Sequence, residues 1–155
     1  MPDYTQIAIR HEAGHATVAL HLRFAVEKID VADGVFRTVL AKDGPAKSNH
    51  ERCVFLAGGI AGERHFYPNT PYDPVGCSRD EAMISQIGGS CIDTYLPEAL
   101  AILRSNDPRL RRFVGELTRI CIGECFAAQQ SSDSAPRGPS FELLSRQEIE
   151  CLWNN

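Results

Sequence analysis

The stretch Arg10-His11-Glu12-Ala13-Gly14-His15-Ala16 lies inside a run of mostly small and apolar residues from Ile7 to Leu22. Such a run predicts an α-helix, from about Thr5 to Phe24, that is largely buried. Residues four apart on a helix lie about 40° apart around its axis and one turn along it. The imidazole rings of His11 and His15 can therefore reach one point from the same face.

His11, Glu12 and His15 match the pattern H-E-x-x-H, in which two histidines bind zinc and the glutamate acts as a general base. Glu12 follows on the flank of the histidine face, where its carboxylate misses the ion but reaches a water beside it. The alternative is a chance match on a helix with two exposed histidines. Because buried His and Glu side chains require partners, a metal ion is the more economical interpretation.

Length and composition favour one globular domain spanning residues 1–155. The chain has 155 residues, of which 43% are hydrophobic and 23% charged. Its formal net charge of −4 argues against a surface for nucleic acid or for an anionic membrane. The six cysteines are scattered, with no C-x-x-C pair, and we interpret them as reduced.

The sequence also contains no candidate for a membrane anchor. No apolar stretch approaches the ~18 residues that a membrane span requires. The N-terminal residues lack the basic region and the following apolar region of a signal peptide. We therefore expect a cytoplasmic protein.

Two β-prone runs follow the motif helix, at Glu27–Val31 and Val35–Leu40, around the turn signal Asp33-Gly34. One strand of this hairpin is a candidate neighbour of the metal. Zinc peptidases typically hold substrate as an added strand along such an edge, through main-chain hydrogen bonds. The alternative is an ordinary hairpin that covers the core. Since the remaining segments are helical in pattern, we expect a mainly α fold with a small β-sheet, of the α+β class.

A second helix is predicted from about Asn49 to Phe66, because Ser48 and Glu51 have the spacing of a capping box. Its centre holds three glycines, each of which costs about 1 kcal/mol in a helix relative to alanine. Close packing against the motif helix would offset that cost. Glu63 would then come near the metal, either as a hydrogen-bond partner of a ligand histidine or as a ligand itself.

Asp80 is a candidate third ligand. Ser78 and Glu81 are spaced as another capping box, which places Asp80 in the first turn of a third helix. One interpretation is that Asp80 merely complements the helix dipole at this position. It can also complete a zinc site, because two histidines need a third protein ligand if one position is to stay open for substrate or water.

The C-terminal half is predicted to be helical. Asp107-Pro108 is typical of a helix start, and that helix extends to about Gln129. Residues 129–140 are rich in Ser, Gly and Pro and are expected to form a flexible loop. Residues 141–155 are expected to form a C-terminal helical segment, in which Ser145 and Glu148 cap the last helix.

In this order, the motifs resemble the peptidase domain of the FtsH family, the membrane-bound ATP-dependent zinc proteases of peptidase family M41. The resemblance rests on the helix at residues 8–16, the small-residue segment 56–63 and Gly76-Cys77-Ser78-Arg79-Asp80, with about 65 residues between His15 and Asp80. It implies that His11, His15 and Asp80 bind Zn²⁺ and that Glu12 is the catalytic base. We expect a stand-alone relative that lacks the ATPase module, with a partner ATPase or unfoldase in trans as one option.

The predicted function is therefore that of a zinc endopeptidase, which hydrolyses unfolded or extended polypeptides with a metal-activated water. The alternative is a catalytically silent zinc-binding domain with a regulatory or interaction role. A structural zinc usually has four protein ligands, so the alternative needs a fourth ligand, for which the candidates are His21, His50 and His65. A cysteine-dependent hydrolase has no supporting His-Cys arrangement.

Overall fold

The computed structural model describes residues 3–69, 77–131 and 138–155. In chain order, its elements are α1 (Tyr4–His21), β1 (Val26–Ala32), β2 (Val35–Leu40), α2 (Asn49–Phe66), α3 (Cys77–Ile87), α4 (Ile92–Ser105), α5 (Asp107–Ser131), β3 (Phe141–Ser145) and α6 (Arg146–Asn154). This is the expected mainly α fold with a small sheet. Within the described ranges, none of the helices combines the length and the apolar composition that crossing a bilayer requires.

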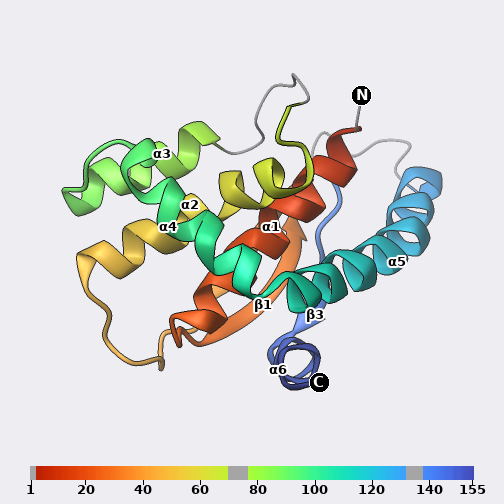
Figure 1. Ribbon diagram of the computed structural model, residues 1–155. Coiled ribbons are helices and arrows are strands. Elements are labelled where there is room, and N and C mark those ends of the chain that lie inside the picture. The colour runs from red at the N-terminus through yellow and green to blue at the C-terminus, as the bar shows by residue number, and fades with distance from the viewer. Residues whose placement is uncertain (1–2, 70–76, 132–137) are drawn as a thin grey trace.

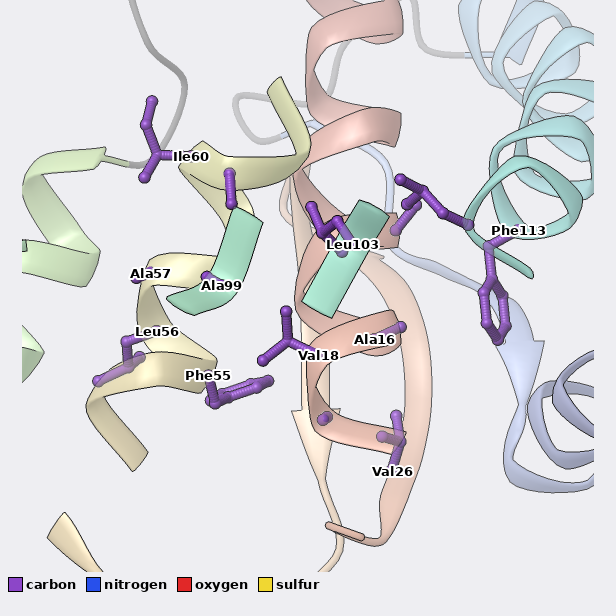
Figure 2. Close-up of a cluster of buried hydrophobic side chains, with 14 of the residues drawn as sticks. Ala16, Val18, Val26, Phe55, Leu56, Ala57, Ile60, Ala99, Leu103 and Phe113 are labelled. Atoms are coloured by element: carbon purple, nitrogen blue, oxygen red, sulfur yellow. The ribbon is translucent and has the colours of Figure 1, made fainter. Parts of the chain in front are cut away.

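Helix α1 lies at the centre of the molecule, with α2, α3 and α4 on one side of it and α5 on the other (Figure 1). Its residues from Ile7 to Ala19 are buried apart from Arg10, as the apolar sequence predicts. Figure 2 shows Val18 of α1 facing Phe55 of α2 across the hydrophobic core. The helix that carries the motif therefore packs directly against α2, α4 and α5.

Local hydrogen bonds define both ends of α1. The Asp3 side chain accepts a hydrogen bond from the backbone N–H three residues ahead at 2.8 Å, which is an N-cap. At the other end, Arg23 has a left-handed φ of 66°. The Phe24 N–H donates to the Ala19 carbonyl at 2.8 Å, a bond typical of helix C-termini. The helix therefore ends at His21, before the boundary expected near Phe24.

The backbones of α1 and α2 touch where the two helices cross. A Cβ at Gly14 would lie 2.9 Å from the Cα of Gly62 and closer still to the carbonyl oxygen of Gly58. A Cβ at Gly62 would collide with the carbonyl oxygen of Arg10. The predicted close packing of the glycine-rich helix against the motif helix is thus confirmed.

The sheet has the strand order β2-β1-β3, so β2 is an edge strand. Strands β1 and β2 form the expected hairpin, and its turn residues Asp33 and Gly34 have φ angles of 51° and 81°. Positive φ at both residues suits a two-residue hairpin turn.

Strand β3 corrects the expectation that residues 141–155 are wholly helical. Phe141–Ser145 pairs antiparallel with β1, and its neighbours Leu143 and Leu144 are both buried. Successive strand residues normally point to opposite faces, but here a register irregularity between Ile29 and Asp30 of β1 accommodates the pair. The segment therefore lacks the alternation that would have identified a strand.

The segments on either side of β3 agree with the sequence prediction in part. Ser145 and Glu148 form the expected capping box at the start of α6. Helix α5 extends to Ser131, so residues 129–131 of the expected loop are helical. Of the remainder, residues 132–137 lie outside the described residues.

Few side chains anchor helix α3. Of its described side chains, from 78 to 87, Asp80 and Ile84 are the buried ones, with exposed fractions of 6% and 1%. The helix begins at Cys77, so Ser78 is already helical and is not the N-cap residue that the capping-box spacing predicts. Asp80 does lie in the first turn, as expected.

Asn106 joins three helices at the junction between α4 and α5. Its side-chain nitrogen donates to the Ile102 carbonyl at 2.9 Å and lies 3.0 Å from Nδ1 of His21, at the end of α1. Its side-chain oxygen accepts a hydrogen bond from Arg109 at 3.2 Å. Because Asn106 is only 6% exposed, these partners satisfy an amide that water reaches poorly.

We predict that Asn106→Ala lowers the free energy of unfolding by about 2 kcal/mol, because it leaves buried partners without their hydrogen bonds. Urea unfolding followed by circular dichroism measures the change. Asn49→Ala is the control, since Asn49 is exposed at the start of α2. Equal losses in the two variants would contradict the prediction.

Candidate metal centre

Three side chains from α1 and α3 converge in the interior. Nε2 of His11 lies 3.0 Å from Nε2 of His15 and 3.0 Å from Oδ2 of Asp80. Nε2 of His15 lies 3.2 Å from the same Asp80 oxygen. All three side chains are buried, with exposed fractions of 2%, 5% and 6%. The residues predicted as ligands from separate parts of the sequence therefore meet at one point.

The cluster fits a zinc ion in its donor atoms and its spacing. Two imidazole nitrogens and a carboxylate oxygen form one of the ligand sets of catalytic zinc sites. Tetrahedral ligands about 2.0–2.2 Å from zinc lie roughly 3.3–3.6 Å from one another. The triangle formed by the ligand atoms needs to widen by only a few tenths of an ångström. In addition, the buried Asp80 Oδ2 has no hydrogen-bond partner of acceptable geometry, which is the state expected of a ligand atom.

Gly59 of α2 leaves the space beside the ligand nitrogens open. A Cβ at this position would lie 2.5 Å from Nε2 of His15 and closer still to Nε2 of His11. Any larger residue would therefore occupy the space that an ion between the histidines needs. This role of Gly59 is separate from the backbone packing made by the other two glycines of α2.

The other ring nitrogen of each histidine is held by α2. Nδ1 of His11 lies 2.6 Å from Oε2 of Glu63, which is fully buried, and Nδ1 of His15 donates to the Phe55 carbonyl at 2.9 Å. These contacts orient the rings and direct each Nε2 toward the cluster. Of the two roles expected for Glu63, the geometry matches that of a hydrogen-bond partner of a ligand histidine.

The charges of the cluster favour bound protons when no ion is present. Burial lowers the pKa of His11, but contacts with the carboxylates of Asp80 and Glu63 outweigh it and raise that pKa to about 10. Burial likewise opposes protonation of His15, but the charge of Asp80 raises its pKa. Burial raises the pKa of Asp80, yet the charge of His15 and the contact with His11 hold it well below its usual range.

Glu12 lies beside the cluster on the wall of a cavity of about 450 Å³. Edge strand β2 forms one side of this cavity through residues 35–39, and Asp80 and Met83 of α3 form another. The Thr38 hydroxyl of β2 donates to Oε2 of Glu12 at 2.6 Å. Sequence reasoning missed Thr38, since its spacing in the chain has no relation to the motif. A strand of the hairpin thus lies beside the three candidate ligands, as the sequence predicts.

The three remaining histidines have partners elsewhere. His21 contacts Asn106, His50 lies 2.7 Å from Glu98, and His65 lies 2.7 Å from Asp107. Among the residues that the structure describes, the group able to hold a metal consists of His11, His15 and Asp80. None of the three histidines considered as a fourth ligand belongs to it.

Comparisons of the chain with protein-family models, with curated proteins and with solved structures gave no match. The resemblance to the FtsH peptidase domain therefore stays a prediction that rests on the motifs themselves.

We predict that Gly59→Ala weakens zinc binding at least ~100-fold without unfolding the protein. The added methyl fills the space beside the ligand nitrogens, whereas alanine is intrinsically the better helix residue by about 1 kcal/mol. Metal analysis after dialysis and chelator competition measure binding.

The matched control is Gly115→Ala on α5, where an added Cβ meets nothing within 4 Å. This variant should bind zinc like the wild type and unfold at a slightly higher urea concentration. Full zinc affinity in Gly59→Ala would show that the ion does not occupy the space beside Gly59.

Zinc affinity should rise about tenfold per pH unit over the pH range in which the ion must displace one proton from His11. Because the pKa of His11 is raised to about 10, this rise should continue well past 6.5, the ordinary histidine pKa. Below the raised pKa the proton competes with the ion, so affinity is lost as the pH falls. Chelator-buffered zinc titrations from about pH 6 to about pH 9 measure the slope; a plateau beginning near pH 7 would mean that His11 is neutral in the metal-free protein.

Proposed function

We propose that the protein is a zinc endopeptidase that hydrolyses unfolded or extended polypeptides. The observation that carries this proposal is the convergence of His11, His15 and Asp80 beside the carboxylate of Glu12, at the wall of an open cavity. Among the residues that the structure describes, the candidate ligand set has three members, which is the number found in catalytic zinc sites, whereas structural sites usually have four.

His11, His15 and Asp80 would hold the ion, and Glu63 and the Phe55 carbonyl would fix the two rings. A bound zinc ion supplies Lewis acidity, which polarises the substrate carbonyl and makes a nearby water easier to deprotonate at neutral pH. Glu12 accepts the proton of the attacking water. It then donates that proton to the nitrogen of the departing amine as the C–N bond breaks. The carboxylate of Glu12 thus carries out both proton transfers.

Edge strand β2 supports an extended polypeptide as the substrate. An edge strand presents unpaired backbone N–H and C=O groups, with which an extended chain can pair regardless of its sequence. Residues 35–39 of β2 line the cavity that contains Glu12. A peptide that pairs with β2 would therefore pass beside the ligand cluster, whereas a folded protein would have to be opened first.

The resemblance to the FtsH family supports the same reaction, and it adds a partner ATPase or unfoldase in trans as a route to folded substrates. A cytoplasmic location is part of the same proposal and rests on the sequence expectation alone. The silent zinc-binding alternative requires a fourth protein ligand. His21, His50 and His65 are each engaged elsewhere, which favours the peptidase.

The test is the cleavage of an unstructured protein and a fluorogenic extended peptide by zinc-loaded wild type, Glu12→Gln, Asp80→Ala and Glu98→Gln. We expect Glu12→Gln to bind zinc and lose at least ~100-fold in rate, since it cannot accept a proton. Asp80→Ala should lose zinc as well as activity. Glu98→Gln, a surface substitution on α4, should match the wild type.

Equal cleavage by wild type and Glu12→Gln would mean that the activity arises elsewhere. Failure of the wild type to cleave either substrate, with zinc bound and no partner added, would favour the silent zinc-binding domain. Full zinc occupancy in Asp80→Ala would remove Asp80 from the ligand set.

A further inference from the structure

Thr38 makes the contact that fixes the Glu12 carboxylate. Its hydroxyl oxygen lies 2.6 Å from Oε2 of Glu12 and 3.2 Å from the backbone carbonyl oxygen of the same residue. Within the described residues, no other side chain forms a hydrogen bond with this carboxylate. Glu12 is 7% exposed, so little water is available to replace a lost partner.

We propose that Thr38 is a positioning residue for the general base, an inference that rests on the proposed peptidase function. The hydroxyl holds Oε2 of Glu12 and leaves Oε1 free for the proton of the attacking water. In this role the Thr38 hydroxyl bonds to Glu12 rather than to the substrate or the ion, and it acts through Glu12.

The strand geometry makes Thr38 suitable for this task. Thr38 pairs with Ile29 in the β1–β2 ladder, so its backbone is fixed by the sheet and not by α1. A β-branched side chain has a restricted χ1 angle, which limits the directions in which its hydroxyl can point. Glu12 has a long side chain with several rotatable bonds. A donor from a second, rigid element therefore removes freedom that the helix alone leaves to the carboxylate.

The same contact connects the base to the strand on which the substrate would lie. Thr38 and Glu12 both line the cavity, one from β2 and the other from α1. A shift of β2 relative to α1 would move the carboxylate away from the attacking water. The inference thus deepens the proposed function by assigning a residue that sets the turnover rate, distinct from the residues that bind the ion.

The experiment compares Thr38→Val and Thr38→Ser with the wild type. Thr38→Val keeps the shape of the side chain and removes the donor, while Thr38→Ser keeps the donor. We expect Thr38→Val to lower kcat about 10- to 100-fold on the fluorogenic extended peptide, with KM unchanged, because it removes part of the contribution of general base catalysis. Thr38→Ser should restore kcat to within about threefold of the wild type, since the hydroxyl returns.

Two further measurements distinguish a positioning role of Thr38 from a merely structural role. Zinc content should be unchanged in Thr38→Val, because Thr38 contacts no ligand atom. Thr118→Val, which removes a threonine hydroxyl bonded to the Val114 carbonyl on α5, should keep the wild-type kcat.

A double-mutant cycle tests the contact without any activity measurement. Thr38→Val should lower the urea midpoint of the wild type more than that of Glu12→Ala, because in Glu12→Ala the carboxylate is already absent and only the weaker contact of the hydroxyl with the backbone carbonyl of residue 12 remains to be lost.

The proposal is overturned if Thr38→Val retains its kcat in an active wild-type background, if Thr38→Ser is as impaired as Thr38→Val, or if Thr38→Val loses zinc. An equal loss of stability in the wild-type and Glu12→Ala backgrounds would also overturn it. A zinc-loaded wild type that cleaves nothing instead defeats the peptidase function, and the catalytic role of Thr38 with it. The activity of the wild type thus distinguishes a failure of the Thr38 proposal from a failure of the proposed peptidase function.

Discussion

The contact between the backbones of α1 and α2 is the constraint on which the rest of the site depends. Gly14, Gly58 and Gly62 allow the two helix axes to approach until backbone atoms touch. This approach brings Glu63 and the Phe55 carbonyl within hydrogen-bond distance of the two imidazole rings. Larger residues at the crossing would push α2 outward, and both rings would lose the partners that orient them.

The same crossing explains how a site with several ionisable groups is tolerated in the interior. Buried charges are costly unless they are paired. Here the Asp80 carboxylate faces the Nε2 atoms of both histidine rings, while the Glu63 carboxylate and the Phe55 carbonyl contact their Nδ1 atoms. Protons on the histidine rings can satisfy these acceptors, and a cation between the rings and Asp80 would be an alternative partner for that carboxylate. If the cluster binds a metal as proposed, the ion would have to displace the protons that these carboxylates favour on the histidines.

The sequence predicts most strongly those features that depend on neighbours along the chain. His11, Glu12 and His15 are identifiable because helical spacing relates them, and the capping boxes of α2 and α6 because each spans one turn. Glu63 was recognised through the helix cost of the glycines around it, which requires compensation by packing. Strand β3 and Thr38 were not predicted, because each depends on a partner far away in the sequence. Two adjacent buried leucines in β3 break the alternation that identifies a strand. Nothing in the sequence of Val35–Leu40 indicates which residue forms a hydrogen bond with Glu12.

The small number of buried side chains on α3 would give an ion bound at the candidate metal centre a structural role as well. Asp80 and Ile84 are the buried side chains of its described part, so one of its two main attachments is itself a candidate ligand. An ion shared by Asp80 and the α1 histidines, as proposed, would link α3 to the rest of the protein, and its binding free energy would add to the docking free energy of that helix. Local opening of α3 and dissociation of the ion would then be one thermodynamic event. Under the proposed function, access to the cavity and occupancy of the metal site would therefore be coupled.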